Sequence, residues 1–214
     1  MKKCSKIFLP LYSFGIIAIF AVILIVPQSR ELFKTLSADH TYIMGFIKFA
    51  LLATSGELIG VRIKQKAWIP PAKLFLRFII WGVIGVWITF MMKLFSLGVS
   101  GMMDVGLLPG KGSIFLSALY TSVIMNTSFG PVFMFLHKCS DLCLESMAKR
   151  EHKSIMEIIK SVDLKGFFGF TIAKTVPIFW IPAHTITFLL PSEYQVIMAA
   201  ALSVVLGVIL SFKK

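Results

Sequence analysis

Six long apolar segments constrain the possible folds of this chain more than any other feature of its sequence. A helix needs about 20 residues to cross the hydrocarbon core of a bilayer, and helices that satisfy their own backbone hydrogen bonds are suited to do so. Only 15% of the 214 residues are charged, against about a quarter in soluble domains. We therefore predict an all-α, polytopic membrane helix bundle that forms a single integral membrane domain over residues 1–214. The predicted spans are 7–26, 43–61, 78–97, 114–136, 166–188 and 195–212.

The first span resembles a signal peptide in outline, because a basic start (MKKCSK) precedes an apolar run. The run is longer than the apolar region of a signal peptide, and it ends in VPQSR without a small-x-small cleavage motif. We predict that this segment is retained as a membrane anchor.

The net charge of +12 is distributed along the chain in a way that predicts orientation. With the N-terminus in the cytoplasm, the inside segments hold sixteen Lys and Arg residues and the outside segments hold three. Such an excess is typical of cytoplasmic loops, so we predict that both termini are cytoplasmic. The basic residues form no patch beside stacking aromatic side chains, which argues against a nucleic-acid partner. Their predicted partner is the lipid bilayer, through anionic head groups.

The segment 140–164 connects the fourth and fifth spans and carries an apolar stripe at helical spacing. We predict a cytoplasmic amphipathic helix that lies near the inner membrane surface. The alternative is that the segment extends an adjacent span into water. The stripe consists of Leu144, Met147, Ile155, Ile158, Ile159 and Val162.

Ionisable side chains within predicted spans are the first candidates for function. Counted at about 1.5 Å per residue, Glu57 and Lys174 both fall in the inner half of the membrane. They predict either a buried ion pair that fixes helix register or part of a solute or proton path, and a protonated Glu57 is a further alternative. Lys48 and Lys93 fall in the outer halves. They either snorkel to the interface or form a basic outer vestibule that favours anions.

Polar residues and prolines mark the fourth and fifth spans. Asn126 lies near the centre of the fourth span and would line the same path, whereas interhelical hydrogen bonding is the structural alternative. Pro177 and Pro182 each remove a backbone donor from the fifth span. A helix broken there frees carbonyls that transporters use to bind solutes, although proline kinks also occur in purely structural spans.

Small residues predict close helix contacts, either within one chain or between the copies of a homo-oligomer. Gly56 and Gly60 flank Glu57 at a spacing of one helical turn, and Gly82 and Gly85 lie close together on the third span.

The residue pattern gives little support for an enzyme active site or a metal site. His137, Cys139 and Cys143 are a weak metal signal, and the odd number of cysteines indicates no disulfide framework. Ser128 and His184 could be paired on paper, but no nucleophile motif surrounds either residue. No phosphate loop or zinc-protease motif occurs. We predict no catalytic residue, no metal and no cofactor.

Several short motifs together resemble the Mpv-seventeen/peroxisomal membrane protein family of small integral membrane proteins. The motifs are SGELIG, MNTSFGP and FWIPAHTITFLLPSEYQV, and the resemblance extends over about residues 46–212 and is clearest over 177–212. Glu57 stands where the family has Asp, and Gln195 stands where it has Arg. The matching positions are Gly56, Phe129, Pro131, Trp180, Pro182, Phe188, Pro191 and Tyr194.

The resemblance implies a compact helical bundle with a pore or small-solute transport role. Eukaryotic members belong to mitochondrial or peroxisomal membranes, whereas the charge bias of this chain suits a bacterial plasma membrane. Our hypothesis is a small-solute channel or transporter-like protein whose path is lined by Glu57, Lys174 and Asn126. The alternative is a non-transporting scaffold or assembly factor that uses the basic loop 137–165 as its partner surface.

Overall fold

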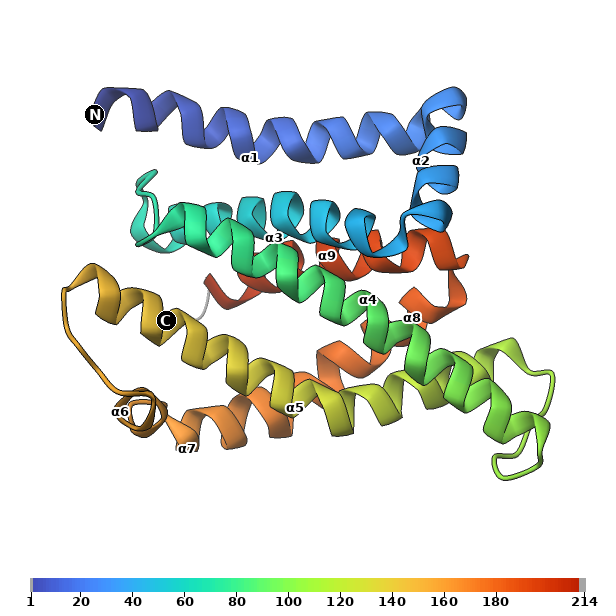
Figure 1. Cartoon of the computed structure of the whole chain (residues 1–214). Helices are drawn as coiled ribbons and strands as arrows, with labels where there is room; N and C mark the ends of the chain where they lie inside the picture. Colours follow the sequence, from blue (N-terminus) through green and yellow to red (C-terminus); the bar gives the residue numbers. More distant parts are fainter. Residues whose placement is uncertain (1, 212–214) are drawn as a thin grey trace. The chain divides into compact units, whose positions relative to one another are not determined.

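Every regular element of the structure is a helix, which confirms the predicted all-α class. The computed structural model describes residues 2–211, and no strand occurs within that range (Figure 1). η1 is a π-helix and the other elements are α-helices. The elements are α1 (Lys2–Ile25), α2 (Pro27–Asp39), α3 (Thr41–Gln65), α4 (Leu74–Asp104), α5 (Ile114–Ala148), α6 (Ile155–Lys160), α7 (Leu164–Gly166), η1 (Phe167–Trp180), α8 (Ile181–Leu189) and α9 (Ser192–Ser211).

Five helical stretches among the described residues are long and apolar enough to cross a membrane. Each overlaps one of the first five predicted spans, but the third and fourth stretches extend well beyond the predicted 78–97 and 114–136. The sixth predicted span, 195–212, falls on α9, whose apolar stretch Ser192–Leu206 is shorter, and residue 212 lies outside the described residues. The five stretches are Ile7–Ile25, Thr41–Gln65, Leu74–Asp104, Ile114–Ala148 and Leu164–Leu189.

The chain divides into two compact units. The first comprises Met1–Phe90 together with Ser192–Lys214, and the second comprises Met91–Pro191. The first unit therefore contains α1, α2, α3, the first part of α4 and α9. The second contains the rest of α4 and all of α5, α6, α7, η1 and α8.

In the first unit, α3 packs against α9 and α1, and glycines allow the closest contacts. A Cβ added to Gly56 would lie 2.8 Å from the Cα of Val204 on α9, so a side chain there would push the backbones apart. Added to Gly82 or Gly85 on α4, it would collide with the ring of Phe46 or with the backbone of α3. The predicted close contacts at these three glycines are confirmed.

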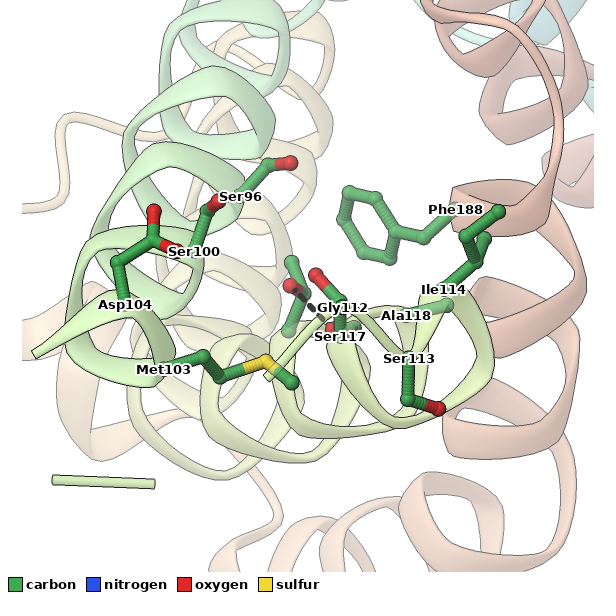
Figure 2. Close-up of a pocket in the computed structure, with 11 residues that line it drawn as sticks. Ser96, Ser100, Met103, Asp104, Gly112, Ser113, Ile114, Ser117, Ala118 and Phe188 are labelled. Carbon is green, nitrogen blue, oxygen red and sulfur yellow. Dashed lines mark hydrogen bonds between the residues drawn. The ribbon is translucent and has the colours of Figure 1, made fainter. Parts of the chain in front are cut away.

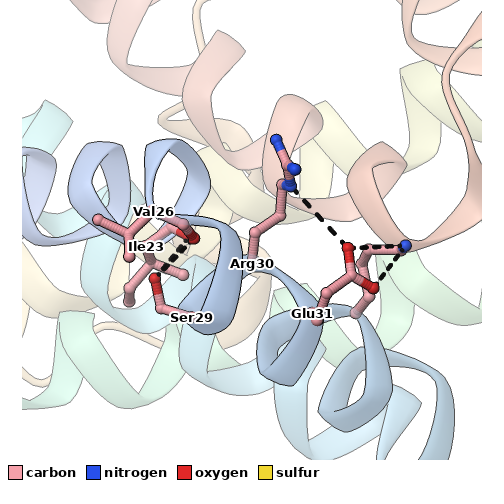
Figure 3. A network of polar contacts seen from close by, with 6 residues as sticks. Ile23, Val26, Ser29, Arg30 and Glu31 are labelled. Carbon is pink, nitrogen blue, oxygen red and sulfur yellow. Dashed lines mark hydrogen bonds and ion pairs between the residues drawn. The ribbon is translucent and has the colours of Figure 1, made fainter.

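The turn from α1 into α2 is made by Pro27 and stabilised by Ser29 (Figure 3). Pro27 has no N–H, so it cannot donate to the carbonyl of Ile23 four residues earlier. The Ser29 hydroxyl lies 3.1 Å from that carbonyl and 3.1 Å from the carbonyl of Val26, either of which it can donate to. On the exposed side of α2, Glu31 accepts a hydrogen bond from Lys34 at 2.9 Å.

In the second unit, the predicted amphipathic helix over 140–164 is not one helix. α5 continues to Ala148, and Arg150 then takes a left-handed backbone conformation with φ of 59°. A new helix, α6, starts from a capping box in which Ser154 and Glu157 satisfy each other's backbone N–H groups. The first part of the predicted segment therefore extends a span, which was the alternative, and α6 packs against α5.

The fifth span keeps its helical path through Pro177, but it changes its winding. Over η1 the hydrogen bonds are of the π type, and the N–H of Ile181 donates to Val176 five residues earlier. Pro182 falls in the first turn of α8, where a missing N–H costs no hydrogen bond. Insertions of π winding are rare and occur frequently at functional sites.

Candidate functional site

A polar pocket of about 270 Å³ opens in the second unit, between the end of α4, the start of α5 and one side chain from α8 (Figure 2). Seven of its eleven lining residues have a polar side chain or are glycine, although the helices that form it are predominantly apolar. The lining residues are Ser96, Ser100, Met103, Asp104, Gly112, Ser113, Ile114, Ser117, Ala118, Thr121 and Phe188.

The polar lining follows the helical repeat on both sides of the pocket. On α4 the stripe runs Ser96, Ser100, Asp104, and on α5 it runs Ser113, Ser117, Thr121. Residues four apart lie above one another on the same face of a helix. The first and last residues of each stripe are eight positions apart, which is about 12 Å along a helix. The pocket therefore carries hydroxyl groups over two helical turns.

Three of these hydroxyls make no hydrogen bond to the described part of the protein. Hydroxyls elsewhere in the spans commonly donate to the carbonyl four residues earlier on their own helix, as those of Thr89 at 2.6 Å and Thr185 at 2.8 Å do. Among the described residues, the hydroxyls of Ser96, Ser100 and Ser117 make no hydrogen bond to the protein. They remain available to a molecule in the pocket, as donors and as acceptors.

The turn between α4 and α5 contributes Gly112 to the lining of the pocket and a cationic partner to Asp104. Gly110 and Gly112 have φ of +87° and +82°, a conformation that glycine adopts without steric cost. Between them, Lys111 Nζ lies 3.6 Å from Asp104 Oδ1 and donates to the Asp104 carbonyl at 3.0 Å. Ser113 caps α5 by accepting from the N–H of Leu116. The carboxylate in the lining thus has a cationic partner.

A second polar group lies further along the same faces of α5 and α8. Asn126 Nδ2 donates to the Ser122 carbonyl at 2.8 Å, and its side-chain oxygen lies 3.0 Å from His184 Nδ1. The Ser122 hydroxyl donates to the carbonyl of Ile181 at 2.7 Å. Ser122 and Asn126 are buried, with exposed fractions of 0% and 3%. Trp180 stacks on the His184 ring, with centroids 5.1 Å apart.

The hydrogen bonds of Asn126 determine the tautomer of His184. Because the amide nitrogen donates to Ser122, the amide oxygen faces His184 and can only accept. Nδ1 of His184 therefore carries a proton and donates to the Asn126 oxygen, so in a neutral ring Nε2 is the unprotonated nitrogen. The Nε1 of Trp180, whose ring stacks on that of His184, is buried without a hydrogen-bond partner among the described residues.

Glu57 is engaged inside the first unit. Arg77 Nη1 lies 2.7 Å from its Oε1, and Trp81 Nε1 donates to its Oε2 at 3.1 Å. Arg77 also donates to the carbonyl of Ala72 at 2.9 Å, and its side chain is only 8% exposed. Arg77 is one of the sixteen basic residues of the predicted inside segments, but it belongs to the first turn of α4. Lys174 lies on η1 in the second unit, and its pairing with Glu57 stays a prediction.

Lys48 does not snorkel towards the interface but is buried, with 2% of its surface exposed. Its ammonium donates to the Ser37 hydroxyl at 2.8 Å and lies 4.4 Å from the ring centroid of Phe33. Tyr194, one of the family-motif positions, stacks on that same Phe33 ring. Lys48 thus ties α2 to α3. Lys93 is exposed on α4 in the second unit, and a shared vestibule with Lys48 stays a prediction.

The other family-motif positions serve packing and helix shape. Phe129 stacks on Phe133 along α5, and Pro131 lies inside the same helix. Pro191 precedes α9. Phe188 is the member of this set that lines the pocket.

Ser128 lies on a different face of α5 from the residue that binds His184. Two residues correspond to about 200° around a helix, and Ser128 is exposed and donates to its own helix. His137 Nε2 lies 3.9 Å from Asp141, while Cys139 and Cys143 are free thiols. No group of three or more His, Cys, Asp or Glu residues within the described range could hold a metal ion.

Sequence reasoning did not single out the hydroxyl stripes, Arg77, or His184 as the partner of Asn126. The stripes carry a signal that could have been found, because their four-residue spacing is visible in the sequence. The partners from other helices carry none, since their proximity depends on how the helices pack.

Comparison of the chain with protein-family models, with curated protein sequences and with solved structures gave no match.

Proposed function

We propose that this chain is an integral membrane protein with six spans and cytoplasmic termini that passes a small polar solute across a bacterial plasma membrane. The five long apolar helices support insertion in a membrane, and the excess of basic residues in the inside segments supports the orientation. The resemblance to the Mpv-seventeen/peroxisomal membrane protein family supports a transport role.

The observation that carries the transport role is the pocket with uncommitted hydroxyls. Hydroxyl groups that bind neither the protein nor a solute do not stabilise an apolar span, because an unpaired polar group is energetically costly away from water. In the proposed orientation α4 ends outside, so the pocket would face the outer side. Ser96 and Ser117 would then bind an entering solute in place of its hydration water. We assign Glu57 a structural role, because Arg77 and Trp81 already hold its carboxylate.

Flux into liposomes that contain the purified protein tests this proposal. Glycerol, urea and chloride serve as probes, and stopped-flow light scattering or an ion-sensitive dye reports their entry. We expect glycerol or urea to enter faster than into empty liposomes. Replacing Ser96 and Ser117 by Ala should slow that entry about fivefold for each hydrogen bond lost.

Thr127→Val is the matched control, because the Thr127 hydroxyl is exposed and donates to its own helix at 2.8 Å. It should leave the flux unchanged. Entry no faster than into empty liposomes for any probe would refute the transport role. A flux that survives both serine substitutions would refute the assignment of the pocket.

A non-transporting scaffold is the second candidate, and the surface of α6 favours it. Ile155 and Met156 are 80% and 59% exposed beside the basic segment 149–153. A stable complex that is lost in Ile155→Asp, together with an absence of flux, would support the scaffold. Unchanged assembly in that variant would count against it.

A further inference from the structure

The pocket between α4 and α5 combines polar groups with an apolar wall, and all of it lies within the second unit. Ser96, Ser100 and Asp104 follow one another at intervals of one turn on α4. Phe188 and Met103 contribute to the apolar wall, and both are buried, with exposed fractions of 8% and 4%. In Figure 2 the Phe188 ring projects from α8 towards α4. A molecule in this pocket therefore meets hydrogen-bonding groups and carbon groups together.

The charged groups at the pocket neutralise each other. Asp104 is the charged residue of the lining, and its Oδ1 lies 3.6 Å from Lys111 Nζ. No donor among the described residues makes a hydrogen bond to either carboxylate oxygen, so both oxygens can accept from a solute. Because the pair has no net charge, an anion meets no unpaired cation in the lining, and a cation would have to compete with Lys111. The lining therefore favours a neutral solute.

From this lining we infer that the pocket binds small neutral polyols, and that a four-carbon polyol such as erythritol binds more tightly than glycerol. A polyol hydroxyl can donate and accept at once, as the serine hydroxyls can, and adjacent polyol hydroxyls can donate together to the Asp104 carboxylate. The C–H groups of the polyol pack against Phe188 and Met103, where burial of apolar area is favourable. The polar groups of α4 recur about every 6 Å along the helix, so a longer chain reaches more of them. The inference rests on the proposed passage of a polar solute and names the class of that solute.

Binding is tested first on the unmodified full chain in phosphocholine detergent micelles, by saturation-transfer difference NMR, which detects weakly bound solutes through their C–H protons. Erythritol and glycerol are the probes, and the four-carbon diol with hydroxyls only at its ends is the matched control solute. We expect a saturable signal from erythritol and binding about fivefold weaker for each hydrogen bond that glycerol or the diol lacks. Erythronate, which has the same carbon chain with a carboxylate at one end, should give no saturable signal.

Substitutions in the lining provide the second measurement. Ser96→Ala and Ser100→Ala each remove one hydroxyl from α4 and should weaken erythritol binding about fivefold. Alanine has a higher helix propensity than serine, so α4 stays helical in both variants. Thr127→Val is the matched control, because the Thr127 hydroxyl lies outside the lining and donates to its own helix at 2.8 Å. It should bind erythritol as the wild type does.

Binding in micelles and flux into liposomes separate this inference from the proposed function. Saturable erythritol binding that weakens in the two serine variants supports the polyol site even if no probe crosses the membrane, in which case only the transport role fails. Flux of urea or chloride without saturable erythritol binding would leave the transport role and overturn the polyol class, because the pocket then holds water alone. Erythronate binding as tight as that of erythritol, or erythritol binding unchanged in both serine variants, would overturn the inference equally.

Discussion

Replacing Glu57 by Gln tests whether the buried carboxylate is structural. Gln keeps the shape and an acceptor for Trp81, so the change removes mainly the negative charge opposite Arg77. That pair is joined at 2.7 Å, and the Arg77 side chain is 8% exposed. Removing one member of a buried ion pair costs about 3–5 kcal/mol, because the other charge is left uncompensated. We expect a loss of about 2–4 kcal/mol, since Glu57 is partly exposed and Arg77 keeps the Ala72 carbonyl.

A double-mutant cycle isolates the pair from other effects of the substitutions. The free energy of unfolding would be measured in mixed detergent micelles for wild type, Glu57→Gln, Arg77→Met and the double variant. We expect the double variant to be more stable than the sum of the single losses predicts, by about 2 kcal/mol or more. The surface pair Glu31–Lys34 is the matched control, with side chains 63% and 38% exposed. It should give a coupling below about 1 kcal/mol.

A coupling for Glu57–Arg77 no larger than that of the surface pair would refute this reasoning. Wild-type stability combined with abolished solute flux in Glu57→Gln would refute it in another way, because the carboxylate would then belong to a path.

Three further predictions concern other parts of the chain. Lys48→Met should leave the free energy of unfolding unchanged or raise it by about 1–2 kcal/mol in chemical unfolding, because the buried ammonium has no carboxylate partner among its hydrogen bonds. A clear loss of stability would contradict this prediction. Gly56→Ala should cost about 1–3 kcal/mol in the same assay by separating α3 from α9, whereas Gly15→Ala, with nothing within 4 Å of the added Cβ, should not destabilise the protein. In α6, the backbone N–H and the hydroxyl of Ser154 donate hydrogen bonds to Glu157 and lower its pKa. The carboxylate therefore stabilises the helix at neutral pH. This contribution is lost as the pH falls below the ordinary Glu value of 4.5. Amide hydrogen exchange in α6 should show that loss of protection on acidification, and a pH-independent protection would contradict it.

The amino-acid sequence was sufficient for the helical class and for the positions of five long apolar helices, although α4 and α5 extend beyond the predicted spans. Both follow from local properties: an apolar run of about 20 residues has few alternatives to a helix that crosses a membrane. The close contacts at Gly56, Gly82 and Gly85 were predictable for a similar reason, because a missing Cβ allows a close approach whatever the partner is. The break within 140–164 was missed because an apolar stripe continues across a gap in the helix, whereas the capping residues that end and restart helices give a weaker signal.

Partner identity was decided by tertiary structure alone. Depth within the membrane favoured Lys174 as the partner of Glu57. The structure brings Arg77 and Trp81 of α4 to the carboxylate, and Arg77 lies just before the predicted third span. Lys48 was expected near the interface, but α2 folds back over it and supplies Ser37 and Phe33. The sequence thus determined which segments are helical, which are apolar enough to span, and which carry polar groups. Which polar groups meet depends on the rotation and packing of helices far apart in the chain, and no local pattern encodes that.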